Sequence, residues 1–391
     1  MSACFSPGAI NGLALKNRFI KAATFEGMTP GGIPSPRLKD FHCRIAQGGV
    51  AMTTLAYCAP EPDGRLHENT MFLDEHVRES LSSLIMDIQR AGTKISGQLT
   101  HCGSFTRNRQ LRGKRSLGPS AGLNLLGMAH GMPFCSAMRT RDIDALVENF
   151  GRAAAFMKSV GFDCVELHFG HGYALCQFIS PKTNRRTDEY GGSLENRMRL
   201  PLRVLEAVRD AVGDELPIIG KISLTEGARN GLKYDEAVEV ARMLDGAGID
   251  GIVTSGGSST MNPMIMFRGD NISKALLEHE KNPLARLGIR LMRRRMFPDY
   301  AYRELYFLDH AKRVRDAVQC KVIYIGGAAT RASFDTLMAQ GFDFIQLGRA
   351  LLADPDCVLH AQRVADYVNP CTHCNRCVGY IDHPEGIRCV L

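Results

Sequence analysis

The sequence predicts an α/β protein, a single (β/α)8 TIM barrel with long loops after the third and sixth strands. Short apolar runs recur along the chain, and each precedes a polar or glycine-rich turn and a longer helical pattern. This alternation is typical of βα units on a parallel sheet. Eight units suffice to close a barrel, and 391 residues can form one such domain. The eight expected strands are residues 18–23, 50–56, 94–99, 164–169, 217–222, 251–255, 321–326 and 344–348.

The segments between these runs repeat apolar residues at spacings of three and four, as amphipathic helices do. Four examples are residues 79–92, 144–161, 234–248 and 333–341, and glycine commonly ends such a pattern just before the next strand. The repeating pattern of helix and strand therefore extends from one end of the chain to the other.

Two connections are unusually long. Residues 103–141, after the third strand, are rich in Gly, Pro and Arg and are expected to form a lid or wall over the site. Residues 257–310, after the sixth strand, contain the basic run from Arg290 to Arg295. Most charge runs cover a solvated helix face, and we favour that interpretation here. The alternative is contact with the phosphates of a nucleotide or of coenzyme A.

Composition narrows the class of protein. Hydrophobic residues make up 45% and charged residues 23%, which is typical of a globular chain with an ample core. The chain has neither a signal-peptide pattern nor 18 consecutive apolar residues, so we expect a cytoplasmic protein that does not enter membranes. Thirteen cysteines scattered over this length indicate reduced thiols. A net charge of +7 favours small anionic ligands over nucleic acid.

The active site of a barrel lies at the C-terminal ends of its strands, where this chain carries several reactive side chains. The fourth strand ends in ELHFGHGY, which brings His168, His171 and Tyr173 close together. From the residues alone they could be metal ligands, an acid and base pair, a clamp for negative charge or a crowded loop. Lys221 ends the fifth strand, where it could stabilise an anionic ring, form a Schiff base or make a salt bridge at the rim.

Three further strand ends suggest a ligand with a phosphate and a polar ring. Gly326 and Gly327 follow the seventh strand, and Gly348 and Arg349 follow the eighth. Glycines let backbone N–H groups approach phosphate oxygens, and the last two strands of a barrel are the usual place for such a site. Gln98 ends the third strand with an amide that can both donate to and accept from a ring edge.

Taken together, these motifs resemble the Old Yellow Enzyme family, in the branch with the NADH:flavin oxidoreductases and the barrel domain of bacterial 2,4-dienoyl-CoA reductase. The resemblance rests on KNRFIKAA, AYCAPEPDGR, QLTHCG, the stretch from ELHFGHGY to SLENRMRL, GKIS, IGGAAT and FIQLGRALLADPD, and it covers nearly the whole chain. It implies an FMN-dependent ene-reductase with a ping-pong cycle, in which NADH or NADPH reduces the flavin and flavin N5 passes hydride to the β-carbon of an activated alkene.

The resemblance also implies roles for individual residues. His168 and His171 match the donors that hold the substrate carbonyl oxygen, and Tyr173 matches the proton donor to the α-carbon. Physical chemistry favours this over a metal pair, because no third ligand of suitable spacing is present. The residues that match the flavin site are Ala23, Thr24, Ala56, Cys58, Gln98, Lys221, Gly326, Gly327, Gly348 and Arg349.

The chain departs from the family pattern at two positions. Lys221 stands where Arg is usual, and Phe25 stands where many members place a Thr or Cys. Both changes bear on the flavin potential, since a bidentate fork and a hydrogen-bond donor are lost. Two alternative functions stay open. One is a Schiff-base lyase that uses Lys221, and the other is an NAD(P)H oxidase or flavin-binding protein without ene-reductase activity. The sequence also leaves open whether the chain forms a homo-oligomer.

The C-terminal segment is rich in cysteine. We divide the chain into an FMN-binding barrel, residues 1–369, and a tail, residues 370–391, packed on it. Clustered thiols signal a metal site in general, and the dienoyl-CoA reductase relatives hold a 4Fe-4S cluster here with a different spacing. Because their further flavin domain does not follow in this chain, we favour reduced thiols over a cluster or zinc. The four cysteines are Cys371, Cys374, Cys377 and Cys389.

Overall fold

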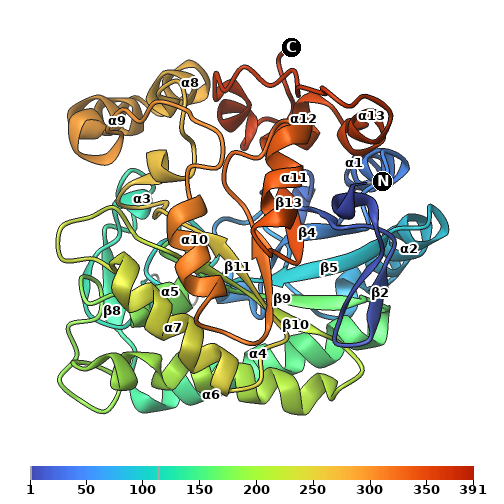
Figure 1. Cartoon of the computed structure of the whole chain (residues 1–391). Helices are drawn as coiled ribbons and strands as arrows, with labels where there is room; N and C mark the ends of the chain where they lie inside the picture. The colour runs from blue at the N-terminus through green and yellow to red at the C-terminus, as the bar shows by residue number, and fades with distance from the viewer. Residues whose placement is uncertain (1, 112–114) are drawn as a thin grey trace.

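A computed structural model describes residues 2–111 and 115–391 of the chain. Eight parallel strands follow one another around a closed barrel in chain order (Figure 1). The last strand pairs with the first through Leu347 opposite Lys21, which closes the ring. All eight strands predicted from the sequence are present, and the predicted fold is confirmed. They are β3 (Phe19–Lys21), β4 (Met52–Cys58), β5 (Lys94–Leu99), β9 (Cys164–Phe169), β10 (Ile218–Ser223), β11 (Gly251–Ser255), β12 (Lys321–Tyr324) and β13 (Phe344–Leu347).

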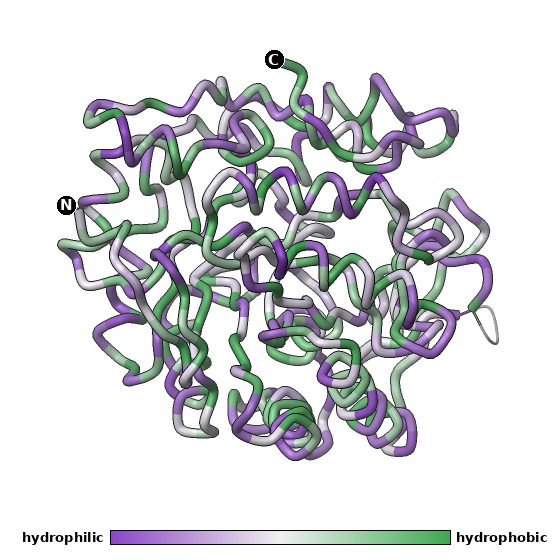
Figure 2. The backbone as a smooth tube through the Cα atoms, turned by 90° about the vertical axis from the view of Figure 1, so that its right-hand side faces the viewer, coloured by the Kyte–Doolittle hydropathy of each residue, from purple (hydrophilic) through white to green (hydrophobic). Residues whose placement is uncertain are grey.

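Helices surround the barrel and bury one apolar face each. Figure 2 shows hydrophilic and hydrophobic residues alternating along them, as expected for helices between a core and solvent. Two predicted helices end as the sequence indicates, because Gly161 and Gly248 adopt positive φ angles of 98° and 81°. The surrounding helices are α1 (Pro36–Gln47), α2 (Arg78–Arg90), α4 (Thr140–Val160), α6 (Leu194–Val212), α7 (Tyr234–Gly246), α10 (Leu308–Arg315), α11 (Arg331–Ala339), α12 (Arg349–Ala353) and α13 (Cys357–Arg363).

A hairpin that the sequence did not predict covers the N-terminal end of the barrel. Its strands are β1 (Gly8–Ile10) and β2 (Leu13–Leu15), which pair antiparallel. Ile10 and Leu15 are buried in one cluster with Met52 and Val253 from the barrel strands. This cluster seals the end of the barrel away from the strand C-termini, so the opposite end is left for a site.

The loop after β5 forms the expected wall. It contains β6 (Ser116–Gly118), β7 (Gly122–Leu123), the short helix α3 (Leu125–Met128) and β8 (Phe134–Ala137). Residues 112–114 of the insertion predicted from the sequence lie outside the described residues. The three strands form a small sheet of their own, in the order β6, β8, β7.

The loop after β11 carries two helices above the barrel, α8 (Ile272–His279) and α9 (Pro283–Met296) (Figure 1). The basic run from Arg290 to Arg295 lies on α9, and no residue of that helix is buried. The cysteine-rich segment lies against α8 through its short helix η7 (Arg376–Tyr380). Across the described ranges, every helix is too short or too polar to cross a membrane.

Candidate active site

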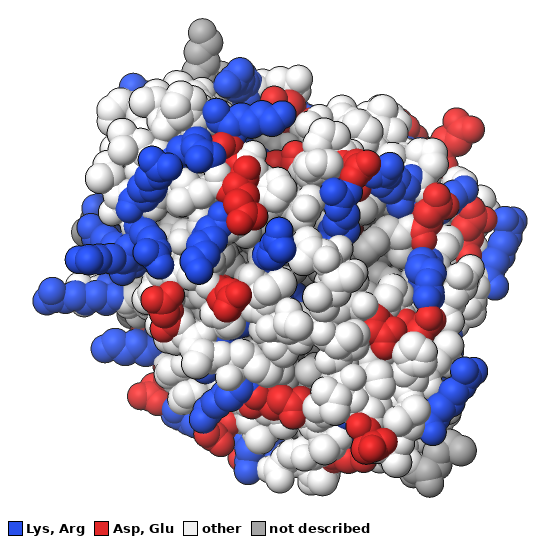
Figure 3. All heavy atoms as spheres, turned by 90° about the horizontal axis from the view of Figure 1, so that it is seen from above, with Lys and Arg blue, Asp and Glu red and all other residues white. Residues whose placement is uncertain are grey.

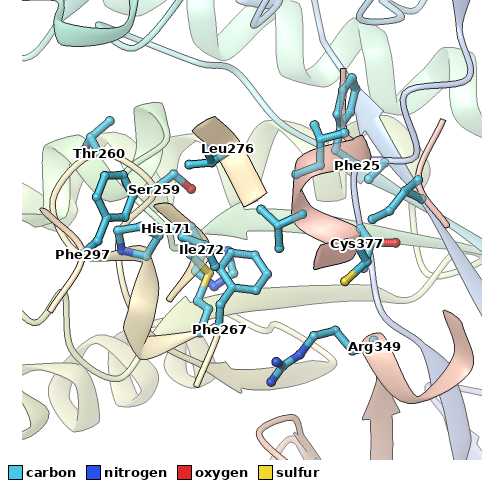
Figure 4. A pocket seen from close by; sticks show the side chains of 18 of the residues that line it. Phe25, His171, Ser259, Thr260, Phe267, Ile272, Leu276, Phe297, Arg349 and Cys377 are labelled. Carbon is cyan, nitrogen blue, oxygen red and sulfur yellow. The ribbon is translucent and has the colours of Figure 1, made fainter. Parts of the chain in front are cut away.

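A cavity of about 940 Å³ opens at the C-terminal ends of the barrel strands. Most side chains singled out from the sequence line it, although they come from seven different strands or the turns after them. Figure 4 shows His171 on one side of the opening and Arg349 and Cys377 on the other. The predicted residues that line it are Ala23, Thr24, Ala56, Gln98, His168, His171, Tyr173, Lys221, Gly326, Gly327, Gly348 and Arg349.

His168 and His171 bond to each other in a chain that ends on two hydroxyl groups. His168 Nε2 lies 3.0 Å from His171 Nδ1, and the ring planes are nearly perpendicular. Thr100 Oγ1 lies 3.3 Å from His168 Nδ1, and Ser255 Oγ lies 2.8 Å from His171 Nε2. The hydroxyls of Thr100 and Ser255 fix the orientation of the two rings. Both histidines line the cavity, and their facing nitrogens are His168 Nε2 and His171 Nδ1.

Both imidazoles are neutral near pH 7. Burial lowers the pKa of His171 to about 3, with a smaller contribution from the charge of Lys221. Burial, His171 and Lys221 together hold the pKa of His168 well below its usual range. A neutral imidazole carries a single N–H. Of the two nitrogens that face each other, one therefore donates and the other accepts.

Tyr173 belongs to an aromatic wall beside the histidines. Its ring centroid lies 4.7 Å from that of His168 and 5.2 Å from that of Tyr57. Tyr57 in turn stacks on Phe25 at 5.2 Å. Burial raises the pKa of the Tyr173 phenol well above its usual value, and a hydrogen bond with Ser259 only partly offsets this. The phenol therefore stays protonated throughout the neutral range.

Lys221 is buried and forms an ion pair. The sequence alone did not decide between this arrangement and a free amine. Its Nζ lies 2.9 Å from Oε1 of Glu166, a fully buried carboxylate on β9. Gln98 donates to the same oxygen at 2.6 Å, and Gln346 donates to Glu166 Oε2 at 3.0 Å. Sequence reasoning missed Glu166 and Gln346, although a carboxylate in the apolar run CVELHF could have signalled a buried partner.

The turns after β12 and β13 form a cradle of backbone. Gly326 and Gly327 have φ angles of 143° and 81°, and a Cβ there would come within 2.6 to 2.7 Å of the Phe307 and Tyr306 rings. Among the described residues, no acceptor takes the backbone N–H of Gly326, Gly327 or Gly348. These N–H groups are thus available to a ligand in the cavity.

Cys58 is placed differently from the other residues that the resemblance assigns to the flavin site. Its side chain is fully buried and does not line the cavity, whereas Ala56 and Tyr57 do. The pairing of β4 with β5 shifts register between Leu55 and Cys58. Such an irregularity re-aims the side chains that follow it. Tyr57 therefore occupies the wall where the sequence placed Cys58.

The C-terminal segment closes part of the cavity near Arg349. Arg349 donates to Asn375 Oδ1, and Asn375 Nδ2 donates to the carbonyls of Phe267 and Asp270 at 2.7 Å. Next to these contacts is a second, small cavity of about 20 Å³. The cysteines that line this small cavity are Cys371, Cys374, Cys377 and Cys389.

The sequence matches one protein family and several known proteins. The family model for the NADH:flavin oxidoreductase / NADH oxidase family matches residues 3–274. The chain is 35% identical to 4,4'-dithiodibutanoate disulfide reductase of Rhodococcus erythropolis, over 99% of the chain and 94% of that enzyme. It is 31% identical to NADPH dehydrogenase of Bacillus velezensis, over 72% of the chain and 81% of that enzyme. Two other curated relatives are longer, and the chain spans 53% of each.

Solved structures share the fold. A 2-naphthoyl-CoA reductase complex superposes with a TM-score of 0.79 at 23% identity, over 97% of this chain and 56% of that one. An old yellow enzyme homologue from Zymomonas mobilis superposes with a TM-score of 0.72 at 19% identity, over 98% and 99%. The resemblance stated from the sequence motifs is confirmed. The chain belongs to the NADH:flavin oxidoreductase / NADH oxidase family and is a flavin-dependent oxidoreductase.

Proposed function

We propose that the protein binds FMN in the large cavity and reduces the C=C bond of an activated alkene, an enone, enal or enoyl ester, at the expense of NADH or NADPH. The observation that carries this proposal is the arrangement of His168, His171 and Tyr173 on one wall of the cavity that also holds Gln98 and Lys221. Neutral donors, a protonated phenol and a buried cation together suit a reaction that develops negative charge on oxygen.

The polar groups of the cavity fit a flavin. Gln346 Oε1 is buried and has no donor within the described part of the chain, so it is free to accept from a ring N–H. Gln98 and Lys221 lie in the same hydrogen-bonded group around Glu166. The glycine turns offer unpaired N–H groups to a phosphate, and Arg349 adds positive charge beside them. These residues would hold the isoalloxazine edge and the phosphate.

When bound and reduced, the flavin supplies hydride to the β-carbon of the alkene. The protein's own part is to hold the carbonyl oxygen of the substrate. We propose that this oxygen takes the place of the bond between His168 Nε2 and His171 Nδ1, so that both nitrogens donate to it. The Ser255 hydroxyl can then donate to His171 Nε2 and fix the required tautomer. One such donor contributes about 10² to 10³ in rate.

Tyr173 is the proposed proton donor to the α-carbon. Replacing Tyr173 with Phe should lower alkene turnover about 10² to 10⁴ fold, which is what a general acid contributes. Reduction of the flavin by NADPH should be unchanged, because that step needs no proton from the phenol. Stopped-flow measurement of the two half-reactions separates these effects. A Tyr173→Phe variant with full alkene turnover would limit the phenol to packing in the aromatic wall.

The pH dependence follows from the pKa directions. The pKa of His171 is depressed to about 3, so its neutral form is present at every higher pH. The pKa of Tyr173 is raised, so its proton is lost only in strong alkali. We therefore expect kcat/KM for the alkene to be constant from about pH 6 to about pH 9. An acid limb near pH 6.5 that disappears in the His171→Asn variant would contradict this assignment.

An anaerobic titration tests the function directly. We expect a yellow protein whose absorbance is bleached by NADH or NADPH and restored by cyclohexenone. A colourless preparation that FMN cannot reconstitute would overturn the flavin proposal. A flavin that is bleached and then reoxidised only by oxygen would instead identify an NAD(P)H oxidase. Lys221 lies against a buried carboxylate and is not placed to react as a free amine, which argues against a Schiff-base lyase.

A second candidate function is reduction of an organic disulfide. It is favoured by the match to a disulfide reductase along 94% of that enzyme's length. Two electrons and two protons convert the disulfide to two thiols, and the histidine pair could donate to the sulfur that leaves as thiolate. Adding 4,4'-dithiodibutanoate to the same reduced protein distinguishes the two functions. Reoxidation by the disulfide but not by cyclohexenone would favour this candidate.

The cysteine-rich segment bears on the cofactor content. All four thiols line one small cavity, although Cys389 is twelve residues beyond Cys377 in the sequence. In the described residues, however, only Asp354, Asp356 and His360 bring three ligand atoms within 4.8 Å of one another. We propose that these thiols stay reduced, as the sequence indicates. Iron and zinc analysis of freshly purified protein tests this, and four irons per chain would overturn it.

A further inference from the structure

The helix α9 presents a ridge of leucines that no other part of the described chain covers. Leu284, Leu287 and Leu291 are 68%, 52% and 75% exposed. Their spacing of three and four places them on one face of the helix. All three line the same cavity as His171. Solvated leucines at the opening of a catalytic cavity are unusual enough to need a ligand as their explanation.

A second apolar wall faces this ridge across the opening. It is α3, whose Leu125 and Met128 are also about half exposed and line the cavity. Asn282, the residue that caps α9, donates to the carbonyl of Ala129 at 3.0 Å, just after α3. This bond fixes the two walls relative to each other. We call the opening between α3 and α9 the apolar mouth.

The apolar mouth is continuous with the reacting end of the cavity. Phe267, Ile272 and Leu276 line the same cavity as His171, and Figure 4 labels all four side chains around it. An apolar ligand can therefore stay in contact with apolar side chains from the histidine pair outward. The cavity of about 940 Å³ is at the upper end for a single ligand, which leaves space beyond a cofactor.

The opposite face of α9 has a different character. Arg293 lies opposite the ridge by helical spacing, and it pairs with no carboxylate among the described residues. Figure 3 shows Lys and Arg side chains gathered at the side of the molecule where Figure 1 draws α9. This is the solvated basic face expected from the sequence. It offers a matched control, because changes there leave the ridge intact.

We infer that the apolar mouth binds an extended apolar substituent of the substrate, and that Leu284, Leu287 and Leu291 determine specificity for its length. The inference rests on the proposed function, since it places the activated alkene at His168 and His171 and the substituent along the mouth. A substituent that reaches the ridge removes leucine side chains from water and is itself removed from water. Short alkenes leave the ridge solvated and gain nothing from it.

The test is a series of straight-chain 2-enals from six to twelve carbons. In the wild-type holoenzyme, kcat/KM should rise about two- to fourfold for each methylene that the mouth buries. The double variant Leu287→Gln/Leu291→Gln should turn over hexenal normally and lose most of this rise. The control Arg293→Gln, on the basic face, should keep the wild-type dependence. Calorimetric binding of the saturated aldehydes to the oxidised holoenzyme should show the same dependence on length without turnover.

Several outcomes would overturn the inference. A series with no dependence on length in the wild-type enzyme would do so, as would an equal dependence in Leu287→Gln/Leu291→Gln. If the double variant instead changes the mass of the particle in sedimentation and keeps the length dependence, the ridge is covered by a second copy of the chain. Failure of the proposed function looks different. No enal would then be turned over, while the saturated series would still bind according to length.

Discussion

The His168→Ala/His171→Ala variant is expected to lose alkene turnover by about 10³-fold or more while keeping its flavin. In the proposed function each neutral imidazole donates to the substrate oxygen, and one such donor contributes about 10² to 10³ in rate. Flavin reduction by NADPH should persist, because Gln98, Lys221 and the glycine cradle are untouched. Stopped-flow measurement of alkene-dependent reoxidation, with flavin content measured on the same sample, gives the comparison.

The control for this variant is His76→Ala, because His76 is exposed on the short helix η4 (Glu75–Val77) and does not line the cavity. It should leave both half-reactions unchanged. Alkene turnover at the wild-type rate in the double variant, with flavin bound, would remove the pair from the mechanism. The single variants should be non-additive, since the two rings share one hydrogen bond.

The Lys221→Met variant is expected to lower the free energy of unfolding by about 3 to 5 kcal/mol. Removing one partner of a buried pair leaves the other charge without compensation, which is the costly case. Here the remaining charge is Glu166, fully buried on β9 and held by two amide donors, and no other cation of the described residues forms an ion pair with it. Urea unfolding of the purified holoprotein, with flavin absorbance as a second signal, measures the loss.

Two further variants isolate the pair. Lys221→Met/Glu166→Gln removes both charges and should recover much of the lost stability, because an amide costs far less to bury than a carboxylate. Lys158→Met breaks an exposed pair with Glu215 at 3.0 Å and should cost less than about 1 kcal/mol. Equal stability of Lys221→Met and wild type, or of Lys221→Met and the double variant, would show that the buried pair is not what the structure indicates.

The site was predictable where its residues lie next to a strand. His168, His171 and Tyr173 occur within six positions of the chain, and strand β9 carries them to the barrel end together. The fold places every strand's C-terminal end on the same side, so Gln98 and Lys221 follow by the same rule. Cys58 stays a prediction that the cavity lining does not include, because an irregularity between Leu55 and Cys58 changes which residue faces the cavity. Alternation along a strand is no guide across such a point.

By itself, the sequence determined the eight strands, their order and the chemistry at their ends, because these depend on local periodicity and on residues close in the chain. Only the tertiary structure decided which distant groups meet. Glu166 pairs with Lys221 across neighbouring strands, and α3 and α9 form the apolar mouth although more than a hundred residues separate them. The first contact depends on the pairing register of β9 and β10, and the second depends on how the loops pack above the barrel. That packing is set by long-range burial, which has no signature in any short stretch of sequence.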